Sequence, residues 1–140
     1  MGGFRLHAVG ELFDVDYYLS QYKIDYSSVW YKGGKQNYQN SGFVKYLGNE
    51  YELNVYEQEK IAHKYMQINK QSLQALVSWK NVNVVILGLS YQFKVFPTVG
   101  TCLSFSPSTI ALAAEIGLEL AFYIEAFISE DYYTPMAEEY

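Results

Sequence analysis

The chain has 140 residues, of which 50% are apolar and 18% aromatic, so it is long enough for one domain with a real core and too apolar to be disordered or fibrous. Fifteen acids against ten bases give a net charge of −5, which argues against a nucleic-acid binder. The single cysteine excludes a disulfide framework within the chain and a zinc site built from several cysteines.

Neither the N-terminal segment nor the longest apolar stretch is typical of a membrane-directed segment. Residues 1–5 carry one positive charge, and no apolar run of signal-peptide length follows them. The stretch 109–128 contains Glu115, Glu119 and Glu125, which a bilayer-spanning helix would have to bury. The sequence therefore predicts a soluble cytoplasmic protein with no membrane partner.

The first part of the chain predicts strand, helix and strand. Residues 4–10 alternate between two faces, as a short strand does. Asp14 has the position and side chain of a helix N-cap, and a helical stripe through Tyr18 ends near Tyr22. Residues 28–32 predict the second strand.

The middle of the chain predicts a third strand and two helical pieces. The strand covers 43–47 and is followed by a turn. Asn54 and Glu57 have the spacing of a capping box, which opens an amphipathic helix. A second helical piece is expected to start at the cap Asn69 and to end near Trp79.

The last part of the chain again predicts strand, helix and strand. Residues 82–93 are rich in β-branched and aromatic side chains, as a central strand is. Ser106-Pro107 is typical of a helix start, and Gly117 of a helix end. Residues 118–127 alternate as a final strand, and residues 129–140 have the acidic composition of a mobile tail.

The order of these elements predicts an α+β fold. We expect one domain over residues 1–140, with a mostly antiparallel sheet of about five strands and three or four helices. The two ends of the chain repeat the same strand–helix–strand order. Two βαβ-like halves, arranged as in ferredoxin-like folds, are a natural way to close such a sheet.

Short motifs in this order resemble a known family. Trp30-Tyr31-Lys32-Gly33 follows the first strand and helix, Ser41-Gly42-Phe43 opens a strand, and Ser106-Pro107 leads a helix into Gly117-Leu118. From Phe4 to Phe127 the chain resembles small bacterial proteins catalogued as a domain of unknown function. The resemblance implies an α+β fold and a bacterial cytosolic protein, and it supplies no catalytic residues. By analogy only, small acidic bacterial proteins are frequent among the immunity partners of secreted toxins.

No residue pattern in the chain specifies a reaction. His7, His63 and Cys102 fall on separate predicted elements without metal-ligand spacing, and the apolar neighbours of Cys102 are typical of a small buried side chain. Asp14 and Asp16 are explained by the favourable placement of acids in the first turn of a helix. We therefore expect no catalytic residue, no metal, no cofactor and no enzymatic activity.

Charge and tyrosine content are the two features that point to a function. Residues 1–94 carry eight acids and ten bases, whereas residues 95–140 carry seven acids and no base. Tyrosine offers a large contact area and a hydroxyl at little entropic cost, and several of the 15 tyrosines lie beside acids. A solvated acidic tail and tyrosines at the core boundary are the alternative explanation. The predicted partner-binding residues are Asp14, Asp16, Tyr17, Glu50, Tyr51, Glu52, Tyr56, Glu57, Glu130, Asp131, Tyr132 and Tyr133.

These features favour an immunity or inhibitor protein. It would bind a basic bacterial toxin domain, a nuclease above all because nucleases hold phosphates, and block it by steric and electrostatic occlusion. A regulatory or homo-oligomeric interaction domain without enzymatic activity is the alternative, and an enzyme with a small site between sheet and helices is a third hypothesis. The sequence does not specify the oligomeric state.

Overall fold

The computed structural model describes residues 3–94 and 102–127 of the chain. The predicted acidic tail, residues 129–140, lies outside the described residues. The elements within them are β1 (Arg5–Gly10), α1 (Val15–Gln21), β2 (Ser28–Trp30), β3 (Ser41–Tyr46), α2 (Val55–Ile68), α3 (Lys70–Val77), β4 (Val84–Lys94), α4 (Pro107–Ile116) and β5 (Glu119–Phe127).

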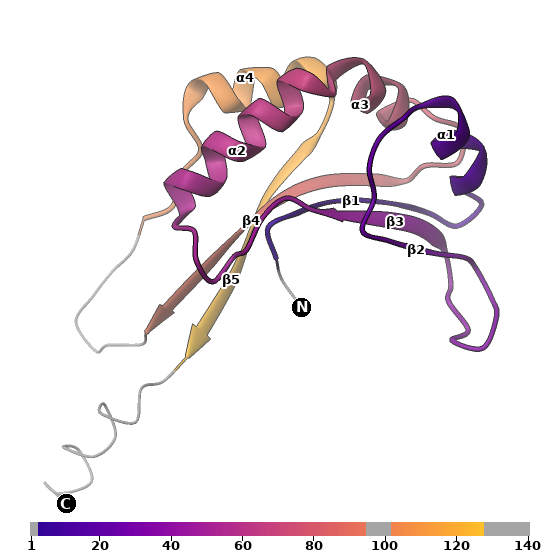
Figure 1. Cartoon of the computed structure of the whole chain (residues 1–140), viewed down its shortest axis with the longest axis horizontal. Coiled ribbons are helices and arrows are strands. Elements are labelled where there is room, and N and C mark those ends of the chain that lie inside the picture. Colours follow the sequence, from indigo (N-terminus) through magenta and orange to yellow (C-terminus); the bar gives the residue numbers. More distant parts are fainter. Residues whose placement is uncertain (1–2, 95–101, 128–140) are drawn as a thin grey trace, which may run out of the picture.

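The strands form one mixed sheet in the order β2-β3-β1-β4-β5. All neighbouring pairs are antiparallel except β4 and β5, which run parallel with α4 as their crossover. Because β3 lies between β1 and β2, and β1 lies between β3 and β4, two βαβ units interleave as in ferredoxin-like folds, and β5 extends this sheet. The predicted α+β class is confirmed. All the described helices lie on one face of the sheet (Figure 1).

The core lies between this face of the sheet and the helices. Alternate residues of the central strands point into it, Leu6 and Ala8 from β1 and Leu87 and Leu89 from β4, as the period of a strand requires. Tyr18 of α1 is fully buried and stacks on other core aromatics. Its ring lies 5.9 Å from that of Phe43 and 5.2 Å from that of Tyr22, and it meets Trp79 edge-on at 5.4 Å. These contacts join α1 to β3 and to the end of α3.

Contacts distant in sequence shape the starts of β3 and α4. β3 begins at Ser41 rather than at Phe43, since β1 pairs with it back to Ser41, whose hydroxyl also accepts a hydrogen bond from the Lys32 backbone at 2.9 Å. Ser106 occupies the N-cap position of α4 but does not cap it with its side chain. The Glu59 carboxylate of α2 accepts from the Ser106 backbone N–H at 2.6 Å instead.

The Glu59 contact ties α2 to α4 and perturbs the carboxyl group. Partial burial alone would raise the pKa of Glu59, but hydrogen bonds from the Ser106 backbone and from the Ser106 and Thr109 hydroxyls outweigh burial and hold the pKa below its ordinary value. Thr109 is itself buried, and its Oγ1 lies 3.2 Å from Nδ1 of His63. Through this network His63 of α2 contacts α4.

We expect alkaline pH to destabilise the protein through Tyr18 and Tyr65. Burial raises the pKa of both phenols above their ordinary value of about 10. Below that pH both phenols are protonated in the folded and in the unfolded chain, so their full contribution to the free energy of unfolding is present. At higher pH the unfolded tyrosines ionise first, and stability falls by up to about 1.4 kcal/mol per pH unit for each group. Urea unfolding between neutral pH and about pH 11 measures this slope.

Tyr65→Phe separates this ionisation from other alkaline effects. The Tyr65 hydroxyl is buried without a hydrogen-bond partner among the described residues, so its removal is expected to cost less than about 0.5 kcal/mol at pH 7. The variant should lose part of the alkaline slope. Equal slopes in the variant and the wild type would contradict the assignment.

Candidate partner-binding groove

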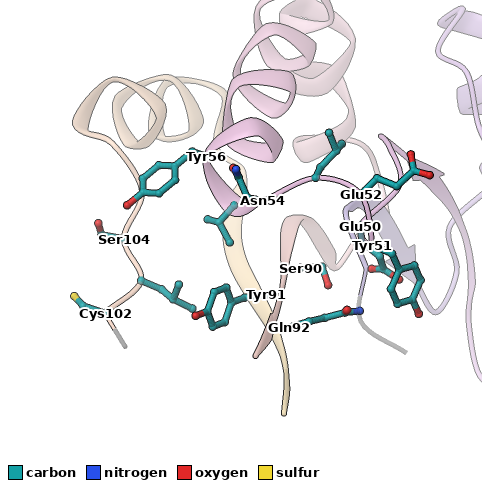
Figure 2. Close-up of a pocket in the computed structure, with 13 residues that line it drawn as sticks. Glu50, Tyr51, Glu52, Asn54, Tyr56, Ser90, Tyr91, Gln92, Cys102 and Ser104 are labelled. Atoms are coloured by element: carbon teal, nitrogen blue, oxygen red, sulfur yellow. The ribbon is translucent and has the colours of Figure 1, made fainter. Parts of the chain in front are cut away.

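A groove of about 500 Å³ lies where the chain enters α2 and β4 runs past the start of β1. Figure 2 shows Tyr56 and Cys102 on one side of it, Tyr51 on the other, and β4 between them. The lining residues are Glu50, Tyr51, Glu52, Leu53, Asn54, Val55 and Tyr56, then Ser90, Tyr91 and Gln92 of β4, and Cys102, Leu103 and Ser104.

Local hydrogen bonds place the acidic and tyrosine side chains on this rim. The Asn49 side chain accepts from the Tyr51 backbone at 2.9 Å and so fixes the turn before α2. Asn54 then accepts from the Glu57 backbone at 2.9 Å, and the Glu57 carboxylate accepts from the Asn54 backbone at 3.4 Å. Since the backbone is held on the inside of the turn and the cap, the side chains of Tyr51 and Tyr56 project outward, 71% and 79% exposed.

The charged side chains that line the groove are both acidic. They are Glu50 and Glu52, and no lysine or arginine is among the described lining residues. One carboxylate oxygen of Glu50, Oε2, is buried and has no hydrogen-bond partner in the described part of the chain, and Nε of Arg5 is in the same state. A buried, unpaired polar atom costs about 1–3 kcal/mol. A hydrogen-bond donor that reached this oxygen would remove that cost.

A buried glutamine closes the end of the groove that faces the core. Pairing between β1 and β4 ends where Arg5 lies opposite Gly88, whereas β4 continues to Lys94. Gln58 of α2 is fully buried next to this point. Its side chain accepts from the Ser90 N–H at 2.7 Å and donates to the Ser90 carbonyl at 2.8 Å and to the Leu53 carbonyl at 3.0 Å. Gln58 thus forms the hydrogen bonds to the Ser90 backbone that a neighbouring strand would otherwise form.

The structure brings together four of the predicted partner-binding residues, Glu50, Tyr51, Glu52 and Tyr56. The other predicted residues that the structure describes do not join them. Asp14, Asp16 and Tyr17 belong to the start of α1, at the opposite end of the sheet (Figure 1). Glu57 lies in the first turn of α2 but serves its cap. The predicted residues Glu130, Asp131, Tyr132 and Tyr133 lie outside the described residues.

The acids around α1 are engaged in local contacts. Asp14 accepts from the Tyr17 backbone N–H at 3.1 Å, which confirms the predicted cap, and Asp16 accepts from the Tyr31 hydroxyl at 2.7 Å. The Tyr17 ring lies 5.7 Å from that of Trp79. These contacts explain the presence of Asp14, Asp16 and Tyr17 by the structure of α1 and its surroundings, whereas the groove acids have no such explanation.

The described acids of the C-terminal part do not line the groove. Glu115 is paired with Lys70 of α3, so it adds little to a negative surface. Glu119 and Glu125 are exposed on β5, and Glu125 accepts a hydrogen bond of 3.4 Å from the Gln92 side chain.

Sequence reasoning missed the half of the groove that comes from Ser90, Gln92 and Cys102. Cys102 was expected to be buried, and this expectation is wrong, because the residue is exposed at the rim just before α4. The one available signal was Gln58, a polar residue in the helical stripe of the buried Ala62 and Met66.

The described residues show no arrangement for a metal and no membrane span. No group of three or more His, Cys, Asp or Glu side chains among them is placed to hold a metal ion. No described helix combines the length and apolar character needed to cross a bilayer.

Comparisons of the chain with protein-family models, with curated proteins and with solved structures found no match.

Proposed function

We propose that this protein is an immunity or inhibitor protein that binds a basic bacterial toxin domain through the acidic, tyrosine-rich groove. It would act in the bacterial cytoplasm by occlusion, without making or breaking a covalent bond. A nuclease domain fits best among toxins, because a site that holds phosphates is basic. A negative surface also accelerates the encounter with such a partner.

The observation that carries this proposal is the buried Oε2 of Glu50, which has no hydrogen-bond partner among the described residues and belongs to a groove without described basic residues. A lysine or arginine of a partner would supply the missing donor and form a charge-assisted hydrogen bond. Tyr51 and Tyr56 line the same groove with exposed rings. Tyrosine and arginine are the residues that most often dominate the binding energy of protein interfaces.

Co-expression with the products of the neighbouring genes tests the proposal, because immunity genes lie beside the genes of their toxins. We expect the chain to restore growth to cells that express a toxic neighbour and to bind that protein when purified. The double variant E50K/E52K should weaken the affinity at least about tenfold, or about 1.4 kcal/mol, and should abolish protection. The matched control is E119K, which reverses an exposed acid at the other end of β4 and β5.

The single cysteine supplies an independent readout of the surface involved. Cys102 is exposed on the groove rim, so a photoreactive maleimide attached there should crosslink to the bound partner. A neighbour that binds with full affinity to E50K/E52K, or that never crosslinks from Cys102, would exclude this groove. Failure to bind or to protect against any neighbouring gene product would exclude the proposed function.

A further inference from the structure

The groove contains a free length of strand edge. β4 spans Val84–Lys94, and β5 pairs with it from Ile86 to Lys94. On its other side β1 pairs with it only as far as Gly88. In the described part of the chain, no strand lies beside β4 after that residue on the β1 side. Figure 1 shows β4 and β5 extending together past the start of β1.

The direction of the backbone groups along this edge follows from the contacts of Ser90. Its N–H and C=O bond to the Gln58 side chain, and β5 occupies the opposite edge of β4, so these groups point toward the side on which β1 lies. Backbone groups of a strand alternate between its two edges. The N–H and C=O of Gln92 therefore point to the same side as those of Ser90, into the space that Tyr51 and Glu50 line.

We infer that the groove binds an extended basic peptide segment of the partner, which adds as a strand to β4 beside Gln92, in line with β1. This inference rests on the proposed function and specifies how the partner is held. Strand addition uses main-chain hydrogen bonds for affinity and side-chain contacts for specificity. The added strand cannot extend past Ser90, because the Gln58 side chain already forms the hydrogen bonds of the Ser90 N–H and C=O.

The chemistry of the walls selects a basic segment. Side chains of an added strand alternate between the two faces of the sheet, so they meet the turn with Glu50 and Glu52 as well as the side that carries Tyr56 and Leu103. A lysine or arginine next to Glu50 would donate to its buried Oε2. An apolar residue between two cations would pack against the tyrosine rings. A segment in which basic and apolar residues alternate fits both walls.

A short fluorescein-labelled peptide of alternating lysine and valine is the probe, with binding followed by fluorescence anisotropy. In an extended peptide, the N–H groups of all lysines point to one edge and those of all valines to the other. Two further peptides carry backbone N-methyl groups on the lysines only or on the valines only. We expect one methylated peptide to bind at least about tenfold more weakly and the other to stay within about twofold of the parent. Equal affinities for the two methylated peptides, or no binding of the parent peptide, would overturn strand addition.

Variants of the chain test the same contact from the other side. Gln92→Pro removes the backbone donor, which is tolerated at an unpaired strand edge, and Gln92→Ala is its control because it keeps the donor and loses the same side chain. We expect only Gln92→Pro to weaken binding of the parent peptide, with circular dichroism confirming that both variants fold. If Gln92→Pro does not fold, the methylated peptides decide.

The outcomes separate strand addition from the proposed function. Peptide binding that falls in E50K/E52K but is equal for both methylated peptides would keep an acidic groove and reject the added strand. A strong difference between the methylated peptides, together with no binding of any neighbouring gene product, would keep the added strand and reject the immunity function.

Discussion

Replacing Gln58 with methionine is expected to destabilise the protein by about 3–5 kcal/mol. The two side chains have a similar shape, so the loss comes from hydrogen bonding rather than from a cavity. Gln58 is fully buried and serves three backbone groups, the N–H and C=O of Ser90 and the C=O of Leu53. Methionine satisfies none of them, and each buried group left unpaired costs about 1–3 kcal/mol. The free energy of unfolding from urea titration measures the effect.

Gln67→Met is the matched control, since Gln67 lies exposed on the same helix. It should change the stability by less than about 0.5 kcal/mol. Amide hydrogen exchange adds a local readout, because Ser90 should lose its protection in the Gln58 variant. A loss of less than about 1 kcal/mol with Ser90 still protected would show that another group replaces the glutamine.

The fold was predictable where the signal was local. The alternation of residues 4–10 and the capping box of Asn54 and Glu57 depend on neighbours within one turn or one strand, and the structure contains both. The order of the elements predicted the α+β class, but the second interleaved βαβ unit consists of β3, the helices α2 and α3, and β4, and not of the last strand, helix and strand of the chain, because β5 pairs directly with β4. The start of α4 was only half predictable, because the group that binds the Ser106 N–H is Glu59, which comes from another helix.

The candidate site was also predictable only in the part that depends on residues close in sequence. The acids and tyrosines between Glu50 and Tyr56 are close in sequence, so composition alone suggested them. The facing strand is not close, and only the register of β1 against β4 leaves Gln92 beside an open edge. Nothing in a short window of sequence encodes where the pairing of β1 with β4 begins. Cys102 was expected to be buried for the same reason. Its apolar neighbours in the sequence do not show that the residue lies exposed on the groove rim.

Tyrosine content was an ambiguous signal, and the adjacent pair Tyr17 and Tyr18 shows why. Helical periodicity placed Tyr18 on the buried stripe, where it has no exposed surface, whereas Tyr17 is 55% exposed. We expect Tyr18→Ala to cost about 3–5 kcal/mol, the usual loss for a large buried aromatic. The ring is stacked between Phe43 and Tyr22, and its hydroxyl donates to the Ser72 carbonyl at 2.8 Å. Urea unfolding measures this loss as well.

Tyr17→Ala is the control for Tyr18→Ala, because it truncates the same type of side chain one position away. It keeps the Asp14 cap, which bonds to the Tyr17 backbone, and should cost less than about 1 kcal/mol. Tyr18→Phe divides the loss further, since it removes only the hydrogen bond to Ser72 and should cost about 1 kcal/mol. Similar losses for Tyr17→Ala and Tyr18→Ala would contradict the burial of Tyr18. Exposure rather than sequence position therefore separates the structural tyrosine Tyr18 from its neighbour Tyr17.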